Sequence, residues 1–217
     1  IVRGEGVADM NEAAVAELSA LIKSKGVQAF GDDTREELQA QMEDGNKKKA
    51  PQRAAALGAF SAITANIGPA GDPFVVPMIG GVLKLCADKE KSVREAAETA
   101  GPGAIASLPA YATKTVVPKL LQSMDSSCRS QTVVGALSTL EKLAESNPNQ
   151  VAQALPDIVP VVSACMVDIT DAVKVQAKKT MQKSCVAIGN KDIEKVIPQI
   201  IEAVSDISLV PETIHAL

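Results

Sequence analysis

The chain has 217 residues, of which only 2% are aromatic, with no Trp and a single Tyr, and its formal net charge is -4. Such a low aromatic content leaves Ala, Val, Leu and Ile to fill the interior, which favours closely packed helices and an all-α fold without a sheet. The acidic balance argues against a chain that is basic throughout, and no run of about 18 apolar residues indicates a membrane span.

The N-terminal part gives weak helical signals. Its start, Ile1-Val2-Arg3-Gly4, lacks the basic and apolar segments of a signal peptide, so we expect a soluble cytoplasmic protein with no membrane partner. Residues 11–24 and 34–43 have the apolar spacing of amphipathic helices. We therefore predict that residues 1–46 form divergent N-terminal helices.

A longer helix is predicted from Lys48 to Ile67, and its start is basic. Lys47, Lys48 and Lys49, with Arg53 on the same helix, form a candidate contact for RNA. The alternative is an ordinary solvated helix start, partly neutralised by the acids before it. Because no aromatic residues interleave with these lysines, any contact would be to the phosphate backbone and not by stacking on bases.

From residue 76 onward a Pro-containing pattern repeats. It occurs at Val76-Pro77, Val117-Pro118, Val159-Pro160 and Ile197-Pro198, and consecutive prolines are 41, 42 and 38 residues apart. This period is typical of helix-pair repeats. We expect each proline in the first turn of a first helix, where its missing N–H needs no partner, and an aspartate after that helix that caps the second one.

The order of proline, aspartate, valine and basic residue resembles the HEAT repeat, as in Pro160, Asp168 and Val173-Lys174. This resemblance implies an α-solenoid of antiparallel helix pairs over residues 47–217, truncated at its C-terminal end. The expected pairs are 73–87 with 90–108, 113–124 with 128–145, and 151–167 with 170–188, followed by a helix at 192–206 and a partner beginning at Pro211.

Two Gly-rich segments interrupt this pattern. Gly80-Gly81 lies in a predicted first helix and Gly101-Pro102-Gly103 in a predicted second helix, so we expect a kink or an early break at each. Neither segment has the Lys-Ser/Thr ending of a phosphate-binding loop.

The sequence offers no convincing catalytic or cofactor site. The single histidine, His215, has no serine or cysteine near it in sequence that could act with it as a nucleophile. The four cysteines lack the close spacing of a zinc or redox motif, and buried, reduced thiols are expected. We therefore predict no enzyme activity, no metal and no cofactor.

The second basic candidate is the helix from Ala172 to about Ile188, which contains no acidic residue. Its apolar and small residues share one side of the helical wheel, and the other half is basic. That basic half carries Lys174, Lys178, Lys179 and Lys183. A concentrated positive face can attract phosphates even on an anionic chain, although a merely solvated helix is the alternative.

Three segments, taken in this order along the chain, carry a more specific resemblance: Leu155 to Ser163, Gly189 to Pro198, and Val210 to His215. They resemble the amino-terminal HEAT region of translation elongation factor 3. The resemblance implies a ribosome-binding surface that contacts rRNA and ribosomal proteins. It also implies a longer parent, an ABC-type ATPase that assists elongation and binds ATP in cassettes elsewhere.

Two other functions remain open on the sequence alone. One is the HEAT region of a general-control translation regulator, which binds ribosomes and regulates a kinase. The other is a scaffold or transport-receptor solenoid that binds protein partners through its surface. None of these readings calls for a specific DNA partner.

Overall fold

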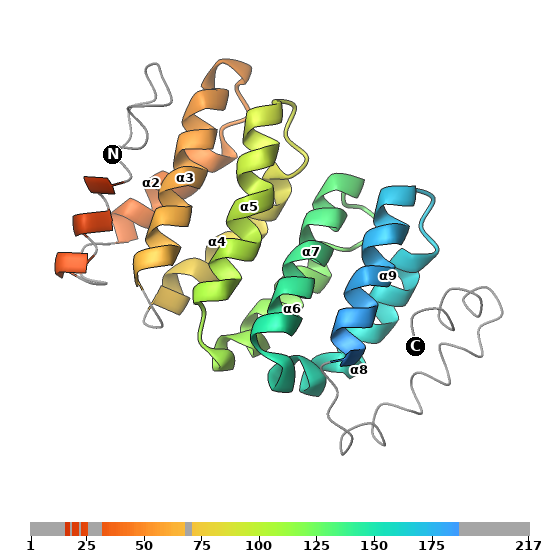
Figure 1. Ribbon diagram of the computed structural model, residues 1–217. Coiled ribbons are helices and arrows are strands. Elements are labelled where there is room, and N and C mark those ends of the chain that lie inside the picture. Colours follow the sequence, from red (N-terminus) through yellow and green to blue (C-terminus); the bar gives the residue numbers. More distant parts are fainter. Residues whose placement is uncertain (1–15, 18, 22, 26–31, 68–70, 187–217) are drawn as a thin grey trace. The chain divides into compact units, whose positions relative to one another are not determined.

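The computed structural model describes residues 16, 17, 19–21, 23–25, 32–67 and 71–186 (Figure 1). Across these residues all regular structure is helical, which confirms the all-α prediction. None of the described helices is long and apolar enough to cross a membrane. Several predictions lie outside the described residues: the helix at 192–206, its partner from Pro211, the motifs after residue 186, and much of the helix at 11–24.

The chain divides into two compact units, residues 1–109 and 110–217. Unit 1 contains α2 (Asp32–Glu43), the short 3-10 helix η2 (Lys47–Lys49), α3 (Ala50–Ile67), α4 (Asp72–Leu85) and α5 (Lys91–Ser107). Unit 2 contains the 3-10 helix η4 (Ala110–Ala112), α6 (Thr113–Gln122), α7 (Ser130–Ser146), α8 (Pro148–Met166) and α9 (Asp171–Val186).

Each unit is built from two helix pairs in two layers. In unit 1 the first helices α2 and α4 lie beside one another, and the second helices α3 and α5 pack along each other in front of α4 (Figure 1). In unit 2, α6 contacts α8 and α7 packs on α9 in the same way. The three predicted pairs therefore exist, with ends within a few residues of the prediction. The predicted boundary between residues 46 and 47 stays a prediction.

The second helices share one buried face, which recurs at intervals of 40 residues. Within each helix the buried positions are four, three and four residues apart, the spacing of a single helix face. The equivalent positions are Arg53, Val93, Val133 and Val173; Leu57, Ala97, Leu137 and Ala177; Phe60, Ala100, Leu140 and Thr180; and Thr64, Ala104, Ala144 and Ser184. The repeat therefore includes α3, where Arg53 occupies the position that holds valine in the later pairs.

The repeated prolines are not in the first turn, so that prediction is wrong. Pro77, Pro118 and Pro160 lie inside α4, α6 and α8, because each helix begins several residues earlier. All three are exposed. An interior proline leaves the carbonyl four residues before it without a backbone donor, and on an exposed face water can take that place.

The early breaks predicted at the Gly-rich segments do not occur. α4 continues through Gly80-Gly81, and α5 continues through Gly101-Pro102-Gly103. Ala100 and Gly101 are buried in α5. Tertiary packing of this apolar face therefore outweighs the poor local helix propensity.

The cysteines are free, but only two are buried. Cys86 and Cys165 lie in the interior, whereas Cys128 and Cys185 are half-buried, so the prediction of uniformly buried thiols is wrong for the second two. Burial is the main cause that raises the pKa of Cys86 to about 12 and of Cys165 to about 11. Both thiols therefore stay protonated and inert near neutral pH.

Candidate nucleic-acid interface

The turn between the two helices of each pair contains the same kind of hydrogen bond. In each, an aspartate carboxylate accepts the backbone N–H of the residue two positions later. The bonds are Asp44 to Asn46 at 3.0 Å, Asp88 to Glu90 at 2.8 Å, Asp125 to Ser127 at 2.9 Å and Asp168 to Thr170 at 2.7 Å. The aspartate thus closes the turn. The prediction that it caps the second helix is wrong in α5, where Glu90 is the N-cap residue and makes no side-chain cap.

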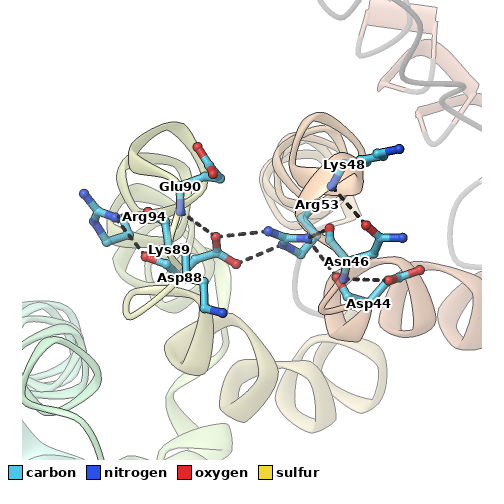
Figure 2. Close-up of polar contacts among 8 residues, drawn as sticks. All are labelled: Asp44, Asn46, Lys48, Arg53, Asp88, Lys89, Glu90 and Arg94. Atoms are coloured by element: carbon cyan, nitrogen blue, oxygen red, sulfur yellow. Dashed lines mark hydrogen bonds and ion pairs between the residues drawn. The ribbon is translucent and has the colours of Figure 1, made fainter.

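Arg53 joins two successive turns of unit 1 (Figure 2). Its Nε and Nη2 donate to the two carboxylate oxygens of Asp88 at 2.9 and 3.1 Å. Its Nη1 donates to the backbone carbonyls of Asp44 and Asn46, both at 2.8 Å. The side chains of Arg53 and Asp88 are only 4% and 11% exposed. Arg53 is therefore a structural clamp, and its proposed part in the RNA contact is wrong because its guanidinium is already occupied and buried.

The clamp keeps Asp88 ionised. Burial opposes ionisation of this carboxyl, but hydrogen bonds from Arg53 and the Glu90 amide, with the charges of Arg53 and Arg94, outweigh it and lower the pKa of Asp88 below its usual value. A carboxyl with a lowered pKa stabilises the fold above its unfolded pKa of about 3.9, and this contribution is lost as the pH falls through the lower folded value.

We expect acid to erase the stability difference between the wild type and Asp88→Asn. At neutral pH the wild type should be the more stable protein, because only it has the ionised pair. Below about pH 4 the difference should shrink, since Asp88 becomes protonated in the wild type. Urea unfolding of both proteins at a series of pH values measures this. A difference that stays constant down to the lowest pH would contradict the assignment.

The clamped turns carry exposed lysines. Lys47 and Lys48, in η2 just before α3, are exposed and form no ion pair within the described part of the chain. Lys49 is exposed too, but its Nζ contacts Asp44 at 2.7 Å. On the neighbouring turn Lys89 is exposed, again without an ion pair among the described residues (Figure 2).

We name Lys47, Lys48 and Lys89 the turn edge. The first turns of η2 and α5 contain no acidic residue, although Glu90 is the N-cap residue of α5. Lys89 was missed by sequence reasoning because it stands alone between Asp88 and Glu90. The matching position after Asp44 is Gly45, so the repeat pattern gives no signal for this lysine.

Three of the four lysines of α9 have carboxylate partners. Lys179 contacts Glu141 of α7 at 3.7 Å, and Lys183 contacts Glu145 of α7 at 3.1 Å. Hydrogen bonds from Lys183 and Lys142 lower the pKa of Glu145, so this carboxylate stays charged. Within α9, Lys174 pairs with Asp171 at 3.0 Å.

Lys178, the fourth of these lysines, is half-buried and makes a contact of its own. The opposite side of α9 is buried at Val173, Ala177, Thr180, Met181 and Ser184, which confirms the predicted packing face. The sequence places the lysines on one side of α9, but in the fold carboxylates of α7 partly neutralise their charge.

Nothing in the described residues forms a metal centre: no group of three or more His, Cys, Asp or Glu side chains could hold an ion.

Two layers of antiparallel helix pairs, joined by a repeated aspartate turn, are the architecture of an α-solenoid of the HEAT and armadillo class. Kap121p and Kap95p, two solved structures, have this fold. Kap121p gives a TM-score of 0.58 at 15% identity over 99% of this chain and 22% of its own; Kap95p gives 0.55 at 13% over 95% and 27%.

A family model fixes the identity further. The model described as the EF3 N-terminal HEAT repeat matches residues 11–181, so the chain belongs to the family of elongation factor 3 N-terminal HEAT regions. Elongation factor 3 of Candida albicans is 32% identical over 97% of this chain and 20% of its own length. Elongation factor 3 of Gonapodya prolifera is 39% identical over 67% of this chain and 13% of its own length. The chain thus spans at most about a fifth of these relatives.

Proposed function

We propose that this chain is the ribosome-binding HEAT region of an elongation factor 3-like protein, acting in the cytoplasm, and that its turn edge contacts rRNA. The observation that carries the proposal is the pair of adjacent, clamped turns that present Lys47, Lys48 and Lys89 without carboxylate partners in the described structure. Membership of the elongation factor 3 family supports the ribosome as the partner.

The chemistry of this contact is electrostatic. Exposed lysines attract phosphate oxygens, and each neutralised phosphate releases counterions, which favours binding at low salt. Because Arg53 fixes both turns through Asp88, Asp44 and Asn46, the lysines lie on a rigid support. Less of the binding energy is then lost to ordering the loop.

The other lysines have secondary roles in this proposal. Lys49 and the α9 lysines Lys174, Lys178, Lys179 and Lys183 can contribute once rRNA phosphates compete with their present partners. Ribosomal proteins are proposed to contact other parts of the helical surface. The parent is proposed to be an ABC-type ATPase that assists elongation, with ATP bound outside this chain, which itself has no enzyme activity. Relatives named elongation factor 3 favour this reading over the general-control regulator.

Co-sedimentation with ribosomes tests this function. We expect the chain to pellet with purified ribosomes at low salt and to be released progressively as salt rises, with a linear dependence of the logarithm of the binding constant on the logarithm of salt concentration. A protein of similar size and charge, such as a designed helical repeat protein without basic turns, is the control. A chain that stays in the supernatant at low salt would sink the proposal.

A further inference from the structure

An open groove of about 600 Å³ lies between α6 and α8 in unit 2. One wall is the face of α6 from Thr113 to Leu121, and the other is the first half of α8, including Gln150, Gln153 and Asp157. The groove is far from the turn edge in sequence and lies in the other unit. Its occupant is therefore a separate question from rRNA binding.

The groove combines apolar and polar surface. Leu121 and Ala154, both half-buried, supply apolar contacts, whereas Val117 is only 2% exposed, and the amides of Gln150 and Gln153 lie one helical turn apart on the α8 wall. Each amide offers both a donor and an acceptor. An alternating row of donors and acceptors is what an extended polypeptide backbone presents along its edge.

Two polar groups of α6 lack their usual partners. The Oγ1 atom of Thr113 is buried and has no hydrogen-bond partner in the described structure, although Thr113 lines the groove. The carbonyl of Lys114 lacks its backbone donor four residues later, because that residue is Pro118, which has no N–H. A ligand N–H can take the place of the water at the Lys114 carbonyl.

The charged residues that line the groove favour some classes of ligand over others. The groove has one cation, Lys114, and one anion, Asp157; both are exposed, and no ion pair is recorded for either within the described residues. A balanced pair of charges gives no net attraction for a phosphate backbone. It does complement a ligand that carries one acidic and one basic side chain.

We propose that this groove binds an extended segment of a partner protein. The α6 wall from Thr113 to Leu121 is about 12 Å long, which corresponds to about four extended residues. The segment would place an acidic side chain against Lys114, a basic side chain against Asp157 and a small apolar side chain between them on Ala154. Its backbone N–H and C=O groups pair with Gln150 and Gln153.

Selection from a displayed library of random short peptides tests the proposal. Peptides enriched on the full chain are synthesised, and their dissociation constants are measured by fluorescence anisotropy. We expect micromolar binding by peptides that contain an acidic, an apolar and a basic residue in close succession. Ala154→Trp, which fills the groove, should weaken this binding by at least about tenfold. Lys114→Glu should weaken binding of the same peptides and accept peptides with the acidic residue exchanged for a basic one.

The control is Gln182→Trp, which adds the same bulk to an exposed position of α9 outside the groove. Circular dichroism and thermal unfolding verify that each variant folds. Ribosome co-sedimentation of Ala154→Trp should be unchanged, so a failure of this proposal is distinct from a failure of rRNA binding. Three outcomes would overturn it: no enriched peptide, enriched peptides that bind Ala154→Trp as well as the wild type, or self-association of the chain that Ala154→Trp abolishes.

Discussion

Replacing Arg53 with valine is expected to destabilise unit 1 by about 3–5 kcal/mol, although valine is the residue at this position in the later repeats. The reason is that the substitution leaves Asp88, whose side chain is only 11% exposed, without its cation. It also removes the donor from the backbone carbonyls of Asp44 and Asn46. Removing one partner of a buried ion pair costs more than the pair contributes, because the remaining charge stays buried.

Urea unfolding followed by circular dichroism measures the loss, and hydrogen exchange shows whether it is confined to unit 1. The double variant Arg53→Val with Asp88→Asn is the informative comparison, since it removes both charges. We expect its destabilisation to fall short of the summed single effects by about 1–3 kcal/mol. Arg94→Ala is a comparison at the same turn: Arg94 is half-buried, donates to the backbone carbonyls of Asp88 and Lys89 and adds its charge near Asp88, but makes no hydrogen bond to the Asp88 carboxylate, so a smaller loss than for Arg53→Val is expected. Equal stability of wild type and Arg53→Val would contradict the clamp.

Neutralising the turn edge should weaken ribosome binding far more than neutralising α9. The triple change of Lys47, Lys48 and Lys89 to glutamine is expected to lower affinity by about tenfold or more at low salt, and to reduce the salt slope by about two to three. Co-sedimentation across a salt series gives both quantities. The physical reason is that these three ammonium groups are exposed and unpaired in the described structure, so each is free to neutralise a phosphate.

The matched control changes Lys178, Lys179 and Lys183 to glutamine, which removes the same charge. A smaller effect is expected, with a change in salt slope below about one, because carboxylates of α7 already hold Lys179 and Lys183. A larger effect from the α9 variant would move the principal contact from the turn edge to that helix.

The helix pairs were predictable because their signals are local. Period, apolar spacing and the resemblance to the HEAT repeat together predicted the three pairs from α4 to α9 and the buried side of α9. The first pair, α2 with α3, was harder to recognise for a physical reason. Arg53 is a charged residue at a core position, so a search for hydrophobic residues does not show that it lies at the repeat position of Val93, Val133 and Val173. Asp88, the ion-pair partner of Arg53, lies 35 residues away in sequence, and only folding brings the two together.

The candidate site was less predictable than the fold. Sequence alone located Lys47, Lys48 and Lys49, but it could not show that Arg53 faces inward or that Glu141 and Glu145 of α7 reach the lysines of α9. The prolines were wrongly predicted in the first turn of each helix. Where a helix begins depends on the side chains that pack on it, whereas a proline fixes only its own φ angle and removes one N–H donor. Pairings between neighbouring repeats require the structure.

The exception at Arg53 also bears on how such a chain avoids misfolding. Successive second helices bury similar small and aliphatic side chains, so a protein made of them could pair one helix with the wrong neighbour at little cost. A shift by one repeat would put Arg53 in the apolar surroundings of Val93, away from the carboxylate of Asp88. Burying an unpaired guanidinium there is strongly unfavourable. The same residue that holds two turns together thus distinguishes the first repeat from its near copies.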